Sequence, residues 1–107
     1  MEQNNPLEQR FAGQWLANCR EMEAMGIPMR RTAARIEEKG ACAAAKACLS
    51  GSRLSDGFDR LKELGRLDLS VEALAVTAAF TPLFTDEEAN EALARLCEAG
   101  YGFRARR

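Results

Sequence analysis

The sequence predicts an all-α protein, folded as a compact single-domain bundle of five to six short helices. Three observations predict this class: glycines end stretches of good helix formers, apolar residues recur at helical spacing, and the one strand-like stretch, residues 66–71, has no partner to pair with. A chain of 107 residues can bury roughly two-thirds of its unfolded surface in one core. We therefore expect a single helical domain over residues 1–103, followed by a basic C-terminal tail over 104–107.

The helices are expected near residues 7–25, 30–39, 42–50, 55–64, 70–79 and 86–99. The first is strongly amphipathic, since one side of its helical wheel carries Leu7, Phe11, Trp15, Cys19, Met22 and Met25. We expect this side and Met29 to pack in the core, with an adaptable groove for a partner helix as the alternative. The core is completed by Phe58, Phe80, Leu83 and Phe84.

Glycine just past a helix supplies the left-handed conformation that closes it, which predicts helix ends at Gly26, Gly40, Gly65 and Gly100. At the other end, Thr85 and Glu88 form a capping box for the last helix. Side-chain caps for two more helices are expected from Ser55 or Asp56 and from Asp68 or Ser70.

Two helices have distinctive surfaces. The last one separates an apolar side, Ala89, Ala92, Leu93 and Leu96, from a polar side, Glu87, Glu91, Arg95 and Glu98. The helix at 42–50 is small on every side because it is rich in alanine, so it allows another helix to approach closely. We expect that helix to belong to the same chain.

The chain has no histidine, which excludes Ser/His and Cys/His nucleophile pairs, a histidine general base and a histidine-containing zinc site. The spacing of Cys19, Cys42, Cys48 and Cys97 lacks the close pairs of a zinc knuckle, so we expect reduced thiols that act as small buried hydrophobes. Acidic pairs such as Asp68 and Glu72 lie in first helical turns, where the helix dipole explains them. We expect no catalytic residue, no metal site and no cofactor.

The net charge of −1 argues against wholesale phosphate neutralisation, but the charge is unevenly distributed. Residues 29–53 carry six Lys and Arg against two Glu, and the tail adds three arginines. The polar and acidic start of the chain does not resemble a signal peptide, and no apolar run is long enough to span a bilayer. We therefore expect a cytoplasmic protein without a membrane partner.

The basic residues are the candidate contacts for a partner protein or nucleic acid: Arg30, Arg31, Arg35, Lys39, Lys46, Arg53, Arg104, Arg106 and Arg107. In the first expected basic helix, Arg31, Arg35 and Lys39 follow at intervals of four and form one line. The helix, glycine turn and helix that follow have the outline of a helix-turn-helix. The second helix nevertheless offers only Lys46 to read bases, and a solvated basic face explains the same residues.

The stretches Gly65-Arg-Leu-Asp-Leu69, Glu72-Ala-Leu74, Leu83-Phe-Thr-Asp-Glu-Glu88 and Gly100-Tyr101 fall within residues 55–101. In this region the chain resembles small uncharacterised bacterial proteins associated with mobile genetic elements. The resemblance implies an accessory protein encoded by a phage or mobile element that works by binding, such as an inhibitor of a host defence complex. It carries over no functional residues.

The sequence thus predicts a non-enzymatic accessory protein of bacterial or mobile-element origin that acts through protein–protein interaction, as a regulator or inhibitor of a host complex. The alternative is a DNA-binding regulator that uses the basic segment 30–53 and binds as a homodimer.

Overall fold

The computed structural model describes residues 6–51 and 53–101 and confirms the all-α class, since no strand occurs among these residues. The helices are α1 (Pro6–Ala24), α2 (Arg30–Lys39), α3 (Ala41–Ser50), α4 (Phe58–Leu64), α5 (Val71–Ala75) and α6 (Asp86–Glu98), with single 3-10 turns η1 (Leu67–Leu69) and η2 (Thr81–Leu83). The radius of gyration is 13.0 Å, as expected for one compact domain of this length. The expected boundary between residues 103 and 104 lies outside the described residues.

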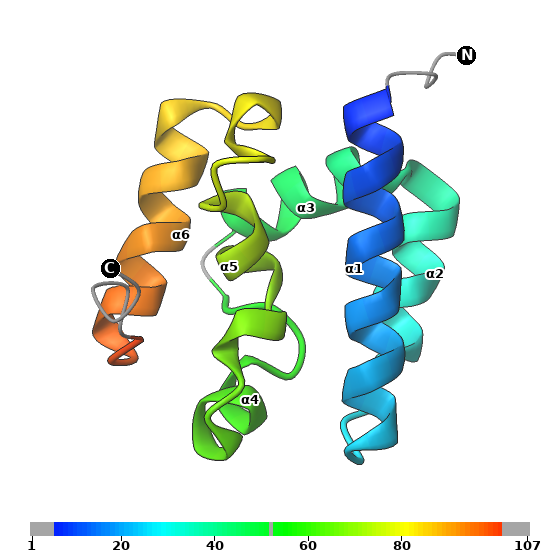
Figure 1. Ribbon diagram of the computed structural model, residues 1–107, viewed down its shortest axis with the longest axis vertical. Coiled ribbons are helices and arrows are strands. Elements are labelled where there is room, and N and C mark those ends of the chain that lie inside the picture. Colours follow the sequence, from blue (N-terminus) through cyan, green and yellow to red (C-terminus); the bar gives the residue numbers. More distant parts are fainter. Residues whose placement is uncertain (1–5, 52, 102–107) are drawn as a thin grey trace.

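The helices are arranged around α3 and α5 (Figure 1). The long helix α1 lies beside α2 at one side of the molecule, and α6 lies at the other side, where it packs on α5. Helix α3 crosses between them and contacts α1, α2 and α6. Its central place follows from its composition, because Ala41, Ala44 and Ala45 are buried and let three helices approach. The expectation of a partner helix from the same chain is confirmed.

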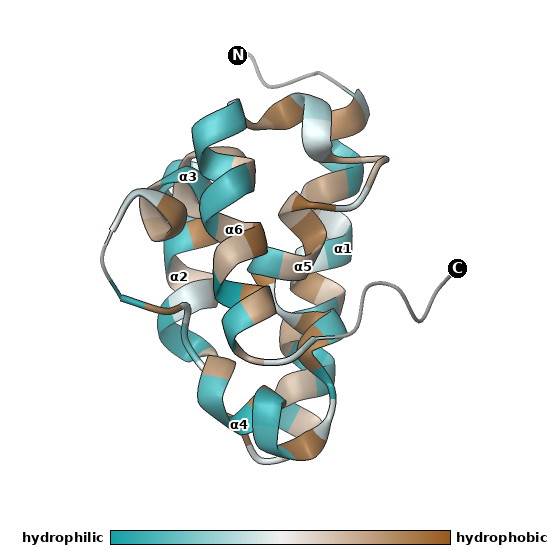
Figure 2. Cartoon of the chain, turned by 90° about the vertical axis from the view of Figure 1, so that its left-hand side faces the viewer, coloured by the Kyte–Doolittle hydropathy of each residue, from teal (hydrophilic) through white to brown (hydrophobic). Residues whose placement is uncertain are grey.

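The amphipathic side of α1 forms the centre of the core. Phe11 is fully buried, and its ring centroid lies 5.7 Å from that of Trp15, 5.4 Å from that of Phe80 and 5.5 Å from that of Phe84. Cys19, Met22 and Met29 are buried as well, and Leu7 and Met25 are partly buried against the core, so the predicted packing of this region in the core is observed. Figure 2 shows hydrophobic and hydrophilic residues mixed along each helix, as expected for helices with one buried side.

Three of the four glycine-terminated helix ends have the expected geometry. At the end of α1, the Gly26 amide donates to the carbonyl of Glu23 and the Ile27 amide to that of Met22, both at 3.0 Å, which is a Schellman motif. Gly65 and Gly100 close α4 and α6 in the same way. Gly40 also follows the last residue of its helix and has a positive φ of 90°, but its ψ of 149° differs from a left-handed cap, and α3 begins at the next residue.

The helices expected at 55–64 and 70–79 are shorter than predicted. Helix α4 begins only at Phe58, after the left-handed Gly57, and neither Ser55 nor Asp56 caps it. Helix α5 does begin after a cap, since the Ser70 hydroxyl accepts from the Ala73 amide at 3.1 Å, but it ends at Ala75. The chain then turns through η2, which brings Phe80 and Phe84 onto Phe11.

Helix α6 has the predicted capping box but a different buried face. The Glu88 amide donates to the Thr85 hydroxyl at 3.1 Å, and the Thr85 amide donates to the Glu88 carboxylate at 2.9 Å. Leu93, expected on the buried side, is 39% exposed, whereas Arg95, expected on the polar side, is 6% exposed. The sequence prediction for Arg95 was therefore wrong, and the reason is an ion pair described below.

Candidate functional site

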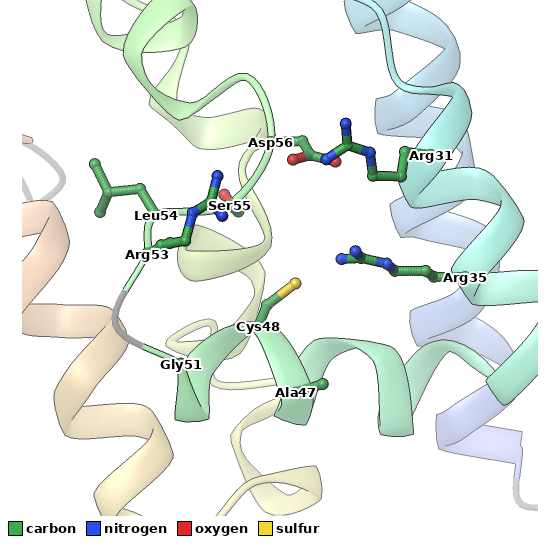
Figure 3. A pocket seen from close by; sticks show the side chains of 9 residues that line it. All are labelled: Arg31, Arg35, Ala47, Cys48, Gly51, Arg53, Leu54, Ser55 and Asp56. Carbon is green, nitrogen blue, oxygen red and sulfur yellow. The ribbon is translucent and has the colours of Figure 1, made fainter.

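Three of the candidate basic residues converge on one cleft of about 230 Å³ between α2, the end of α3 and the loop that follows α3 (Figure 3). We call this the arginine cleft and define it by the residues that line it: Arg31, Arg35, Ala47, Cys48, Gly51, Arg53, Leu54, Ser55 and Asp56. The cleft joins two stretches of the chain, 31–35 and 47–56, that face each other across it.

Helix α2 supplies one wall. Thr32 and Ile36 form its buried side, so Arg31 and Arg35, four residues apart, share an exposed side. Figure 3 shows both side chains extending from α2 toward the loop at 53–56, where the Asp56 carboxylate faces Arg31. The Thr32 hydroxyl donates to Asp56 Oδ2 at 2.8 Å, and this bond ties α2 to the loop beneath the two arginines.

A buried ion pair holds the loop that follows α3 in place. Glu72 of α5 and Arg95 of α6 are in contact at 3.0 Å, and their side chains are 0% and 5% exposed. The Ser55 amide and hydroxyl donate to the Glu72 carboxylate at 3.2 and 2.6 Å. Arg95 Nη2 donates to the carbonyl of Gly51 at 2.9 Å and to that of Cys48 at 3.3 Å. Both ends of the loop are thus fastened to one pair of charged residues.

The polar groups of this ion pair are well satisfied. Arg95 Nε also donates to Glu91 at 2.8 Å, one turn earlier on α6. Burial by itself lowers the pKa of Arg95, but the hydrogen bonds and charges of Glu91 and Glu72 outweigh it and raise the pKa. A buried pair with such geometry and several additional hydrogen bonds escapes much of the desolvation cost that buried charges otherwise carry.

The loop enters α4 through a position that only glycine fits. Gly57 has φ +79°, and a Cβ there would meet Ile27 Cγ2 at 2.8 Å and Met22 Cε at 2.9 Å. The close approach of the backbone to these two buried side chains fixes the far end of the loop against α1 and the turn that follows it. The wall of the cleft that carries Arg53 and Asp56 is therefore anchored at several points.

The cleft has an excess of positive charge. Among the described residues 6–51 and 53–101, the guanidinium groups of Arg31, Arg35 and Arg53 form no hydrogen bond or ion pair. Asp56 is the one acidic residue among those that line the cleft, so the charged lining residues sum to +2. Unpaired arginines with their donors free are suited to bind a carboxylate or a phosphate.

Cys48 lies at the base of the cleft with its thiol directed into it (Figure 3). Burial, together with the charges of Glu72 and Asp56, raises the pKa of Cys48, and Arg35 and Arg95 offset only part of this effect. The thiol therefore stays protonated at neutral pH and forms a neutral, polarizable wall. A nucleophilic cysteine would need a lowered pKa instead.

The other candidate basic residues do not join the cleft. Lys46 forms an ion pair with Glu88 at 3.0 Å and lies 5.5 Å from the centroid of the Phe84 ring, so it fastens α3 to α6. Lys39 lines a separate hollow beside the start of α3, and Arg30 is exposed at the start of α2. Arg104, Arg106 and Arg107 lie outside the described residues. The predicted line of basic residues therefore does not form one site, because Arg31 and Arg35 line the arginine cleft and Lys39 lines the other hollow.

The cysteines are all free, as expected, but they are not all buried. Cys19 is buried, Cys42 and Cys48 are half-buried, and Cys97 is exposed on α6, which contradicts its expected role as a buried hydrophobe. In the part of the chain that the structure describes, no three His, Cys, Asp or Glu side chains are grouped so as to hold a metal ion. None of the described helices has the length and apolarity needed to cross a membrane.

Sequence reasoning found the arginines but missed the residues that position them. Glu72 was explained by its place in a first helical turn, and Ser55 and Asp56 were assigned to helix capping. One signal was present: Glu72 stands in Leu69-Ser-Val-Glu-Ala-Leu-Ala-Val76, an otherwise apolar stretch in which no polar helix face is available to it. Such a residue requires a buried partner. No local pattern identifies Arg95 as that partner.

No protein-family model matches the sequence, and neither a curated protein nor a solved structure matches the chain.

Proposed function

We propose that this protein is a small, non-enzymatic accessory protein that docks on another protein, and that the arginine cleft receives an acidic segment of that partner. One observation carries the proposal: two arginines of α2 and one of the loop after α3 meet at one anchored cleft, and among the described residues their guanidinium groups are unpaired. Charged donors that are already positioned lose little freedom on binding, which favours affinity and specificity. We further propose that this docking regulates or inhibits a host complex, which is what the resemblance predicted from the sequence implies.

The alternative, a DNA-binding regulator, is less well supported. In a helix-turn-helix the second helix inserts its exposed side into the major groove. Helix α3 occupies that position in the sequence, but it is enclosed by α1, α2 and α6 and buries Ala41, Ala44, Ala45 and Leu49. Its charged residue, Lys46, is already engaged by Glu88. The side chains left exposed, such as Ala43 and Ala47, offer bases no hydrogen bonds.

The proposal is tested with a fluorescently labelled hexaglutamate peptide as the probe and fluorescence anisotropy as the readout. The cleft variant removes the three positive charges and combines Arg31→Gln, Arg35→Gln and Arg53→Gln. The control variant removes the same charge from exposed basic residues that do not line the cleft and lie outside the basic segment 30–53, and combines Arg10→Gln, Arg20→Gln and Lys62→Gln. We expect the cleft variant to bind at least about tenfold more weakly than the wild type, a change of about 1.4 kcal/mol.

The control variant should keep its affinity within about twofold when salt is held near physiological ionic strength, where distant charges are screened. Equal losses in both variants would show that net charge, and not the cleft, attracts the peptide. A duplex DNA of random sequence serves as the second probe. Binding of that duplex more tightly than the peptide, with a loss in the cleft variant, would favour the DNA-binding alternative.

A further inference from the structure

We propose that the group recognised by the arginine cleft is a phosphate monoester, so that docking depends on a phosphorylated side chain of the partner protein. This inference rests on the proposed function and goes further, because it names the chemical group and makes binding conditional on a modification. Three features of the cleft support it: its charge, the directions from which its arginines approach, and the hollow next to it.

The charge of the cleft matches a dianion. Its charged lining residues sum to +2, since Asp56 offsets one of the three arginines. Asp56 is held in place by the Thr32 hydroxyl, so it remains part of the cleft when a ligand enters. A carboxylate brings one negative charge and a phosphodiester also brings one. A phosphate monoester brings about −1.5 to −2 at pH 7, which is the charge that neutralises the site.

The arginines approach from two sides. Arg31 and Arg35 extend from α2, whereas Arg53 extends from the opposite loop (Figure 3). A carboxylate is planar, and its two oxygens accept a bidentate arginine from one direction. A phosphate monoester carries three terminal oxygens in a tetrahedral arrangement and accepts guanidinium groups from several directions at once. The opposed arrangement of the arginines therefore fits a phosphate better than a single carboxylate.

The neighbouring hollow offers room for the residues next to a phosphorylated side chain. It has a volume of about 440 Å³, is lined by Gly57, Phe58, Asp59 and Arg60, and shares Arg53, Leu54 and Ser55 with the arginine cleft. Leu54 lines both hollows and is 45% exposed, so its side chain is accessible to a ligand. A peptide whose phosphate occupies the cleft can thus place an apolar neighbour against Leu54.

The frame of the cleft favours recognition of a small, compact anion. The loop is fastened by Ser55 to Glu72 and by Gly51 to Arg95, so the position of Arg53 relative to α2 is set before a ligand binds. The Cys48 thiol at the base is neutral and adds no charge that would repel the phosphate. Preorganised donors of this kind reduce the ordering cost of binding.

The test uses the full-length, ¹⁵N-labelled protein and two short peptides that differ at one position, acetyl-Gly-phosphoserine-Leu-amide and acetyl-Gly-Glu-Leu-amide. Binding is followed by changes in the amide chemical shifts. We expect the phosphoserine peptide to shift the amides of Arg31, Arg35 and Arg53 and to bind at least about tenfold more tightly than the glutamate peptide. Inorganic phosphate should shift the same amides more weakly, since it cannot reach the hollow beside Leu54.

Measuring the affinity of each peptide as a function of pH adds a test that distinguishes a phosphate from a carboxylate. The affinity for the phosphoserine peptide should rise as pH increases through the second pKa of the phosphate, near about 6, because the dianion forms there. The affinity for the glutamate peptide should stay flat between pH 5.5 and 7.5, conditions under which its carboxylate is already charged. The cleft variant should lose at least about tenfold of its phosphoserine affinity, whereas the control variant should lose less than about twofold.

The two levels of inference fail in different ways. Glutamate binding as tight as phosphoserine binding, at the same amides, would overturn the phosphate inference and leave the docking of an acidic segment standing. Dimethyl phosphate binding as tightly as the phosphoserine peptide would also overturn it, since a diester has the chemistry of a nucleic-acid backbone. Absence of shifts at all three arginines with both short peptides, together with no binding of hexaglutamate, would overturn both. An amide spectrum of the free cleft variant that differs from the wild type only near the three substituted residues establishes that it is folded.

Discussion

The loss of the buried Arg95 should destabilise this protein far more than the loss of an exposed arginine. In Arg95→Ala, the Glu72 carboxylate, which is 0% exposed, loses the cation that lies 3.0 Å away. Removal of one partner from a buried ion pair costs about 3–5 kcal/mol, because the remaining charge is left uncompensated. The carbonyls of Gly51 and Cys48 lose their donor too.

A loss of this size is large relative to the stability of a small domain, which is about 5–15 kcal/mol. With about 2.1 cal/mol/K of unfolding entropy per residue, it corresponds to a fall in Tm of about 13–22 °C for this chain. Urea unfolding followed by circular dichroism measures the free energy of unfolding directly. The matched control is Arg60→Ala, which breaks an exposed pair with Glu63 at 3.8 Å and should cost less than about 1 kcal/mol.

The double variant Glu72→Met, Arg95→Met distinguishes the cost of leaving a buried charge without its partner from the cost of losing packing contacts. It removes both charges and keeps side chains of suitable volume, so it should be more stable than Arg95→Ala. The reasoning is refuted if Arg95→Ala costs less than about 1 kcal/mol, because Glu72 would then tolerate isolation in the core. It is equally refuted if the double variant is less stable than the single one.

Three further outcomes follow from other parts of the fold. Gly57→Ala should cost about 2–4 kcal/mol in urea unfolding, since it adds a clash to an unfavourable φ, whereas Gly65→Ala, with open space around it, should cost only about 1 kcal/mol. Burial by itself raises the pKa of Glu88, but the hydrogen bonds from Thr85 and Lys46 and the charge of Lys46 outweigh it and lower the pKa. The ionised Glu88 therefore stabilises the fold above pH 4.5, and this stabilisation is lost as pH falls through the lowered pKa. Glu88→Gln should remove this pH dependence when the free energy of unfolding is measured across an acid titration. In the native protein at pH 8, Cys97 should react with a thiol reagent well before Cys19, whose pKa burial raises to about 11; faster reaction of Cys19 would contradict its buried position.

The parts of the fold that depend on local chemistry could be predicted from the sequence. The buried side of α1, the glycine-terminated ends of α1, α4 and α6 and the capping box of Thr85 and Glu88 each rest on residues within a few positions of one another. Their agreement with the structure follows from that, since spacing along the chain alone sets these contacts.

The parts that depend on distant contacts could not be predicted in the same way. Residues 76–79 have a helical composition, but α5 ends at Ala75 because Phe80 and Phe84 pack on Phe11, far away in the sequence. By its spacing, Arg95 belongs to the polar side of α6. It is buried because it forms an ion pair with Glu72, 23 positions earlier in the chain. Both errors arise where a tertiary contact outweighs a local pattern.

The arginine cleft was partly visible in the sequence. The excess of basic residues at 29–53 marked the right region, and Arg31, Arg35 and Arg53 all belong to it. What the charge pattern could not show is that Lys46 is neutralised by Glu88 and that Lys39 lies elsewhere. Charge counts locate a segment, whereas the distances between side chains decide which charges act together.

The ion pair of Glu72 and Arg95 also connects helix α6 with the arginine cleft. Helix α6 lines no part of the arginine cleft, yet its Arg95 holds the loop that does. Occupancy of the cleft and local unfolding of α6 are therefore thermodynamically coupled: a ligand that needs the fastened loop must slow amide hydrogen exchange in α6, and a second molecule that loosens α6 must weaken ligand binding.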